Sequence, residues 1–275
     1  MKRLRPLLGT WVEIGVEIGV EIGVGDLDAP GVGPAIERAF EAVELVHRLM
    51  SVHETDSDIS RVNRDAWRRP VTVHPWTLGV LRWALSIHAA TEGLFDCALG
   101  HELGRHGLVA GCGFDRAVPG SLADLEIAPN GSIRLGRRIA LDLGGIAKGF
   151  AIDRAIATLR AAGARRASVN AGGDLRVMGG APQPIHVRDA TDARHLRLAG
   201  FLANGAIATS GTDTAIDLAT RRPIADGRTW SVIAPRCIVA DALTKVVAQT
   251  GRTEAPWLAR FGATVWTLSP FAAAA

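Results

Sequence analysis

The sequence predicts an α+β fold, with a mixed sheet flanked by helices, in a single large domain that covers residues 1–275. Segments with the periodicity of strands and of helices follow one another without the strict strand–helix–strand rhythm of a doubly wound sheet. With 48% hydrophobic and 21% charged residues, the chain has the composition of a globular protein with a substantial core. No stretch has the character of a linker, so we expect one domain with inserted loops.

The first predicted strand contains a short repeat. Residues 13–24 read EIGV three times in succession. Because four is an even number, each copy preserves the inward and outward alternation of a strand. The repeat therefore indicates a local duplication within a strand or hairpin, since a solenoid requires longer units.

Two helices are predicted by apolar residues at helical spacing. The first has Ile36, Phe40, Val43, His47 and Met50 on one face, and the second has Leu78, Leu81, Leu85 and His88. Between them, residues 50–63 are typical of a helix end, a capped turn and a new helix, with Asp56 or Ser57 as the cap.

The second half of the chain alternates strands and helices. A short strand over 138–143 is expected to lead through Gly144 and Gly145 into a helix over 152–159. Further strands are predicted at 167–170, 185–188, 230–234 and 263–268, and a helix at 239–248. The segments 104–129 and 179–183 are rich in Gly and Pro and are expected to be loops.

Charge and cysteine content exclude several classes of protein. The net charge is only +3, and the arginine pairs are scattered without interleaved aromatic residues, which argues against nucleic-acid binding. Three cysteines without CxxC spacing favour neither a disulfide framework nor a zinc site. The sequence as written has no apolar region of a signal peptide and no membrane segment, so we expect a cytoplasmic protein.

The strongest local motif is LDLGGIAKG at residues 141–149. A strand ends, two glycines allow close approach of a ligand, and a helix begins whose free N–H groups and dipole attract phosphate. Lys148 adds a full positive charge to the first turn. The glycines match neither a Walker loop nor GxGxxG, so the residues alone leave both a phosphate site and a plain turn open.

Two weaker motifs follow. In the turn at 170–174, Asp174 can accept hydrogen bonds from an adenine amine or a ribose hydroxyl, or it can bond its own backbone. The triplet Thr209, Ser210 and Gly211 is small and rich in hydroxyl groups, which suits phosphate or flavin edges, but such triplets are common.

The helix over 239–248 carries a third polar group. Val239, Ala242, Leu243 and Val246 are expected to form its buried stripe. Asp241 then shares the opposite face with Thr244 and Lys245. A carboxylate and a hydroxyl on one face are suitable ligands for Mg²⁺, although an ordinary Asp–Lys helix pair explains them equally.

Taken in order, these motifs resemble the ApbE family of FAD:protein FMN transferases. The resemblance rests on LLGTWVEI, MSVHETDSDISRVN, GLFD, LDLGGIAKGFAID, SVNAGGDL, AIATSG and ADALTKVV, from about residue 7 to 250. It implies an α+β fold that binds FAD with Mg²⁺ and moves FMN onto a Thr or Ser of an acceptor protein, releasing AMP. Some members instead hydrolyse FAD to FMN and AMP.

The resemblance also implies roles for residues. It places Met50 and Ser51 near the flavin, and Gly173 and Asp174 near the adenosine half. Further candidate FAD contacts are Lys148, Thr209, Ser210 and Gly211, and the candidate Mg²⁺ ligands are the carbonyl of Ala147 together with Asp241 and Thr244. This scheme requires the turn at Gly144 and the helix bearing Asp241 to converge.

Two departures from the family pattern bear on activity. Lys245 stands where the family has a Thr ligand, and the hydroxyl has moved to Thr244, so either Thr244 reaches the metal or the Lys245 ammonium takes over its charge. The segment after Gly211 is shortened and lacks the family's His, which leaves Asp213 and Asp217 as nearby carboxylates. No catalytic residue is assigned.

Three hypotheses follow from the sequence. The chain is an FMN transferase or FAD pyrophosphatase, or an FAD-binding protein without turnover, or a structural relative whose glycine turns serve only the fold. Most of the histidines lack ligand spacing and are expected to be structural or at the surface, whereas His53 is a candidate flavin contact.

Overall fold

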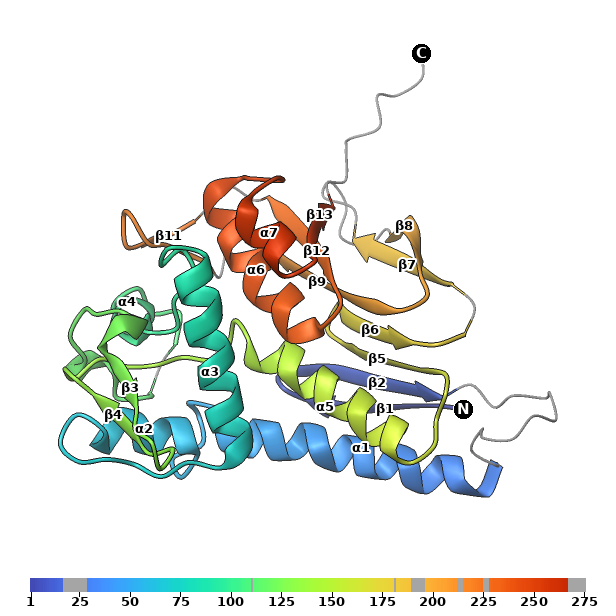
Figure 1. Cartoon of the computed structure of the whole chain (residues 1–275), viewed down its shortest axis with the longest axis horizontal. Helices are drawn as coiled ribbons and strands as arrows, with labels where there is room; N and C mark the ends of the chain where they lie inside the picture. The colour runs from blue at the N-terminus through green and yellow to red at the C-terminus, as the bar shows by residue number, and fades with distance from the viewer. Residues whose placement is uncertain are drawn as a thin grey trace, which may run out of the picture.

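The computed structural model describes residues 1–16, 29–109, 111–180, 182–188, 196–211, 215–224 and 228–266. Its centre is a seven-stranded sheet in the order β1-β2-β5-β6-β9-β12-β13, in which every neighbouring pair is antiparallel. Helices cover one face of this sheet (Figure 1). The predicted α+β class with flanking helices is confirmed.

The strands of the sheet come from the beginning and the second half of the chain. They are β1 (Lys2–Leu7), β2 (Thr10–Val16), β5 (Ala167–Ala171), β6 (Asp174–Met178), β9 (Gly205–Gly211), β12 (Thr229–Ala234) and β13 (Thr264–Trp266). In β2, Val12, Ile14 and Val16 lie on one face of the strand and bury their side chains in the core. The strands predicted at 167–170 and 230–234 correspond to β5 and β12, and β13 lies within the strand predicted at 263–268.

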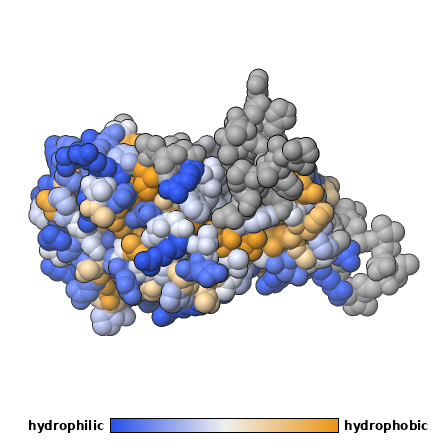
Figure 2. Space-filling view, turned by 90° about the horizontal axis from the view of Figure 1, so that it is seen from above, coloured by the Kyte–Doolittle hydropathy of each residue, from blue (hydrophilic) through white to orange (hydrophobic). Residues whose placement is uncertain are grey.

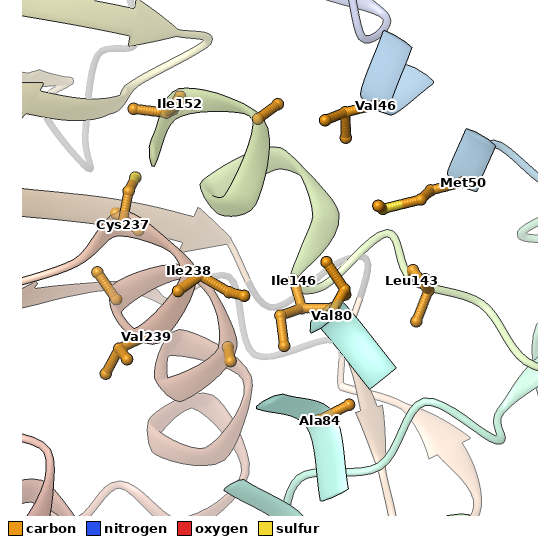
Figure 3. Close-up of a cluster of buried hydrophobic side chains, with 14 of the residues drawn as sticks. Val46, Met50, Val80, Ala84, Leu143, Ile146, Ile152, Cys237, Ile238 and Val239 are labelled. Carbon is orange, nitrogen blue, oxygen red and sulfur yellow. The ribbon is translucent and has the colours of Figure 1, made fainter. Parts of the chain in front are cut away.

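Three long helices pack on the sheet: α1 (Ala29–Met50), α5 (Ala147–Ala161) and α6 (Cys237–Thr250) (Figure 1). They meet α3 (Pro75–Ala90) in one apolar cluster. Figure 3 shows Met50 of α1, Val80 of α3, Ile146 before α5 and Ile238 of α6 pointing into this cluster. The helical spacing in the sequence thus corresponds to the buried faces of these helices.

A smaller, mostly helical region lies beside the sheet at the left of Figure 1. It contains α2 (Asp58–Asp65), α3, α4 (Gly100–Arg105), the 3₁₀ turns Phe114–Arg116 and Leu122–Asp124, and the hairpin of β3 (Leu125–Ile127) and β4 (Ile133–Leu135). Ser57 caps α2 by accepting a hydrogen bond from the Ser60 N–H. Of the two caps predicted from the sequence, Asp56 and Ser57, the second is confirmed.

The remaining elements are short ribbons and one helix. They are the pair β7 (Gln183–Arg188) and β8 (Leu196–Leu202), the pair β10 (Ile216–Asp217) and β11 (Arg222–Pro223), and α7 (Pro256–Arg260). Seen from above, hydrophilic side chains dominate the end that carries the small helical region, and hydrophobic ones gather toward the sheet (Figure 2). Among the helices of the described ranges, none is long and apolar enough to cross a membrane.

One predicted strand is wrong. Residues 138–143 belong to no strand. A side chain takes the place of a neighbouring strand: Asn63 donates to the Leu141 carbonyl oxygen at 2.9 Å and accepts from the Leu141 N–H at 2.7 Å. Leu141 and Leu143 are fully buried, so the apolar pattern reflected burial and not strand pairing.

Most of the EIGV repeat lies outside the described residues. Residues 13–16 form the end of β2, which pairs with β1 on one side and β5 on the other. The later copies of EIGV, from residue 17 onward, lie outside the described residues.

Candidate functional site

The site forms where the first turn of α5 packs against α6. Gly149 lies in that turn, and a Cβ atom placed on it would come within 2.3 Å of the Cys237 carbonyl oxygen. Only glycine permits this approach of two backbones. The glycine turn at Gly144 and the helix that bears Asp241 therefore converge, as the sequence interpretation required.

Asp241 makes the direct link between the two helices. Its side chain is 1% exposed, and its Oδ2 accepts a hydrogen bond from the Gly149 N–H at 2.9 Å. The N–H groups of the first turn of a helix have no partner within the helix, and the dipole favours negative charge there. The carboxylate of Asp241 thus lies beside Ala147 and Lys148, which precede Gly149.

This burial contradicts the expected arrangement of α6. We expected Asp241 and Thr244 to occupy a face opposite the buried stripe, yet both side chains are buried. The cause is that α6 packs on β9 and β12 on one side and on α5 on another. The polar residues lie in these contacts and not on a solvent-exposed face.

A second buried carboxylate pairs with Lys148. The Lys148 Nζ lies 3.0 Å from Oδ2 of Asp174, and the Thr209 N–H donates to Asp174 Oδ1 at 3.1 Å. Burial raises the pKa of Asp174 to about 6, with a further contribution from the charge of Asp241 and opposition from Lys148. Burial acts to lower the pKa of Lys148, but the charges of Asp174 and Asp241 outweigh it and raise that pKa.

Hydroxyl groups connect β9 to α6. The Thr244 hydroxyl donates to the Asp241 carbonyl oxygen at 2.7 Å, and its Oγ1 lies 3.0 Å from Ser210 Oγ. Thr209 Oγ1 lies 2.8 Å from Ser231 Oγ on β12. No motif in the sequence indicates Ser231, because only the antiparallel register of β9 and β12 pairs it with Thr209.

Lys245 completes the cluster. Its Nζ donates to Ser210 Oγ at 2.6 Å, and its side chain lies 3.3 Å from where a Cβ on Gly145 would be. The aliphatic part of Lys245 therefore crosses the glycine turn. Within the described part of the chain, no carboxylate lies within ion-pairing distance of the Lys245 ammonium.

Asp142 borders the same turn and was missed by the sequence analysis. Its Oδ1 accepts from the Gly144 N–H at 2.7 Å. Burial raises the pKa of Asp142, and the Gly144 N–H, His53 and Lys245 oppose that rise. Asp142 is therefore a buried carboxyl group on which both His53 and Lys245 act.

That pocket has a volume of about 400 Å³, within the range of small-molecule sites. Its walls include Val52, His53, Phe114 and Arg138. Cys112 also lines it, with Sγ 3.6 Å from His53 Nδ1. Only His53 was selected from the sequence, because residues 112–117 and 138–140 reach the pocket through loop packing that no local motif indicates.

Met50 and Ser51 lie at the end of α1, immediately before this pocket. The Met50 side chain is buried in the core and points toward the residues around Ile146 (Figure 3). The Ser51 Oγ accepts from the His53 N–H at 3.2 Å, and the Ser57 hydroxyl donates to the Ser51 carbonyl oxygen at 2.7 Å. Their proximity to a flavin stays a prediction.

Most of the residues selected from the sequence are thus brought together. Lys148, Asp174, Thr209, Ser210, Asp241 and Thr244 form one connected cluster, with Ala147 beside it. Gly211 ends β9 next to Ser210, and Gly173 lies in the β5–β6 turn with φ of 101° and its N–H donated to Asn170 Oδ1 at 3.1 Å.

This fold and site define an α+β protein with a buried charged cluster at a glycine-rich helix start, an arrangement suited to anionic ligands. A family model described as the ApbE family matches residues 8–265. The chain therefore belongs to the ApbE family.

Several proteins similar to this chain are named FAD:protein FMN transferases. An FAD:protein FMN transferase of Vibrio cholerae serotype O1 is 29% identical over 231 residues, covering 73% of this chain and 69% of that protein. One of Rhodobacter capsulatus is 27% identical over 219 residues, and the match spans 68% of this chain but only 41% of that longer protein.

Solved structures agree on the fold. The ApbE protein from Thermotoga maritima superposes with a TM-score of 0.76 at 23% identity, covering 91% of this chain and 87% of that one. The flavin transferase ApbE from Vibrio cholerae gives a TM-score of 0.73 at 24% identity, covering 90% and 85%.

Proposed function

We propose that this chain is an FAD:protein FMN transferase. It would bind FAD and join the FMN phosphorus to a Thr or Ser hydroxyl oxygen of an acceptor protein. The bond from that phosphorus to AMP breaks, AMP leaves, and the hydroxyl proton is lost to a base. Membership of the ApbE family supports this proposal, together with one structural observation: the hydrogen bond from the Gly149 N–H to Asp241, which joins the glycine turn to α6.

The pyrophosphate of FAD fits best at the glycine turn. Lys148 and Lys245 bring positive charge to this position from α5 and α6, and the start of α5 adds its dipole. Asp174 is buried and held by Lys148, so it is suited to position the adenosine half, with Gly173, Thr209, Ser210 and Gly211 nearby.

The flavin ring is assigned to the pocket beside His53. The pocket lies next to Met50 and Ser51 and has room for a small aromatic ligand. His53 of the pocket and Lys245 of the glycine turn both lower the pKa of Asp142, so the two are near enough to Asp142 to act on its charge, and a single dinucleotide would extend from one to the other. In this arrangement the chain orients FAD and offsets the charge that develops on the departing AMP.

The resemblance implies Mg²⁺, held by Ala147, Asp241 and Thr244. Mg²⁺ requires near-octahedral oxygen ligands and usually carboxylates. Here one Asp241 oxygen accepts from the Gly149 N–H, and the Thr244 hydroxyl is directed at the Asp241 carbonyl. As arranged, these residues do not fit Mg²⁺, and the metal stays a prediction.

No base is assigned to the acceptor hydroxyl. Of the two nearby carboxylates, Asp213 lies outside the described residues. The Oδ1 of Asp217 accepts from the N–H groups of Ala219 and Thr220, so Asp217 is a turn residue.

The test is to incubate the purified protein with FAD, with and without a candidate acceptor. Chromatography measures AMP and free FMN, and mass spectrometry measures the mass of the acceptor. AMP release together with an acceptor heavier by one FMN group supports the transferase. AMP and free FMN without acceptor modification indicate a pyrophosphatase instead, and FAD binding without AMP indicates a binding protein.

A further inference from the structure

We propose that the ammonium of Lys245 supplies the cation at the pyrophosphate, so that this chain binds FAD without a divalent metal. The inference rests on the proposed function, because it concerns the same ligand at the same turn. It also accounts for the poor fit of Ala147, Asp241 and Thr244 to Mg²⁺.

The position of Lys245 supports this role. Its side chain lies across Gly145, and its Nζ donates to Ser210 Oγ at 2.6 Å. The ammonium is therefore held between the glycine turn and the end of β9. An ammonium is a compact charge with three donors, so after one bond to Ser210 it keeps two for phosphate oxygens.

The charges of the other lysines support it independently. The chain contains three lysines. Lys2 pairs with Glu13 and Lys148 pairs with Asp174, each with an N···O distance of 3.0 Å. Among the described residues, Lys245 alone of the three has no carboxylate within ion-pairing distance, so its charge is the least neutralised of the three.

A divalent ion and Lys245 compete for the same space. Ser210 Oγ binds the ammonium and lies 3.0 Å from Thr244 Oγ1, which is the hydroxyl proposed as a metal ligand. A metal ion bound by Thr244 would thus lie close to a like charge in a partly buried site, where repulsion is poorly screened. The Lys245 ammonium therefore takes the place of the divalent ion and does not bind the pyrophosphate alongside it.

The experiment measures FAD affinity by isothermal titration in EDTA and in Mg²⁺. We expect the same affinity for the unaltered protein in both buffers. Lys245→Met keeps the length of the side chain and removes its charge, and we expect it to weaken FAD binding at least about tenfold in both buffers. Lys2→Met is the control, and its affinity should be unchanged, because Lys2 is an exposed residue of β1.

A second variant tests the exchange of ammonium for metal. Lys245→Thr removes the charge and adds a hydroxyl, so its FAD binding should be weak in EDTA and should recover in Mg²⁺. Circular dichroism and the thermal midpoint report whether each variant is folded. An unaltered protein that loses FAD binding in EDTA and regains it with Mg²⁺ would overturn the inference while leaving the proposed function intact.

Inorganic pyrophosphate separates this inference from the proposed function. In one outcome, the unaltered protein binds pyrophosphate without metal and yet does not bind FAD. If Lys245→Met then weakens pyrophosphate binding, the role of Lys245 is supported and the proposed transferase function is overturned. If the unaltered protein binds neither pyrophosphate nor FAD, both the role of Lys245 and the proposed function are overturned. Equal FAD affinity of Lys245→Met and the unaltered protein overturns the role of Lys245.

Discussion

Gly149 is the residue at which the two helices of the site come closest. Because a Cβ there would lie 2.3 Å from the Cys237 carbonyl oxygen, α5 and α6 must move apart to accept any side chain. We expect Gly149→Ala to lower the free energy of unfolding by about 3 kcal/mol and to weaken FAD binding. Urea denaturation measures the first effect and titration the second.

Gly79 provides the matched control. It lies within α3 and has no atom within 4 Å of its added Cβ. Gly79→Ala should therefore stabilise the protein by about 0.5–1 kcal/mol, because alanine loses less backbone entropy in a helix. A Gly149→Ala variant as stable as Gly79→Ala would show that the two helices are not in close contact.

Asp241 contributes to the stability of the fold as well as to the site. It is buried and bonded to the Gly149 N–H, so Asp241→Ala leaves that N–H without a partner. We expect a loss of about 1–3 kcal/mol in the free energy of unfolding, measured by urea denaturation. The exposed carboxylate of Asp115 is the control, and Asp115→Ala should change stability by less than about 0.5 kcal/mol. Equal stability of the two variants would show that Asp241 does not form a stabilising hydrogen bond with the Gly149 N–H.

Asp124 gives the protein a pH-dependent stability. Two hydrogen bonds from Arg137 lower its pKa, against a smaller opposing effect of burial and with help from the Ser121 N–H. A lowered pKa in the folded state means that the stabilisation is complete above the unfolded pKa of about 4 and is lost as the pH falls through the lower value. The loss is small because the Arg137 side chain is largely exposed, so that solvent screens the pair.

The measurement is the urea midpoint from about pH 6 to about pH 3, in the unaltered protein and in Arg137→Ala. The midpoint of the variant should fall less at the acidic end. Parallel curves would mean that Asp124 and Arg137 do not interact in solution.

At the scale of elements, Asp153 fixes the start of α6. This residue of α5 accepts from the N–H groups of Cys237 and Ile238 at 2.9 and 3.1 Å, and it pairs with Arg176 of β6. A side chain of one helix therefore caps the next, which has no side-chain cap of its own. The cap holds α6 in the position that brings Asp241 to Gly149.

We expect Asp153→Ala to lower the free energy of unfolding by about 2–4 kcal/mol, because two N–H groups and a partly buried Arg lose their partner. Asp153→Asn keeps one acceptor oxygen and should recover part of the loss. Calorimetric unfolding of both variants measures the difference. Identical midpoints for the alanine variant and the unaltered protein would contradict the capping role.

The elements also show what the sequence could predict. The helices containing Phe40, Leu81 and Ile156 were predicted because their apolar residues recur at helical spacing and pack on one side. The buried segment around Leu141 was taken for a strand, because burial alone produces the same apolar pattern. The buried position of Asp241 was missed, because helical periodicity does not reveal that α6 is covered on two sides.

At the scale of the whole molecule, the sheet assembles a site whose parts are distant in sequence. Lys148 meets Asp174 only because β6 lies between β5 and β9 and faces the start of α5. Local motifs identified both residues but gave no information on their pairing. The pocket around Cys112 and His53 depends on packing of the small helical region and had no signal in the sequence beyond His53.

The same topology concentrates charge in one place. The carboxyl groups of Asp142, Asp174 and Asp241 lie near the ammonium groups of Lys148 and Lys245, within a partly buried cluster. Such a cluster is sensitive to an added anion, because a low local dielectric strengthens each interaction. Binding of FAD should therefore order the segments that form the cluster.

Hydrogen exchange measured by mass spectrometry, with and without FAD, tests the central claim that the glycine turn and α6 bind one dinucleotide. The account predicts slower exchange in residues 142–150 and 237–246 when FAD is added, and no change in the β3–β4 hairpin. Unchanged exchange in both of those segments at saturating FAD, or protection confined to other parts of the chain, would contradict it.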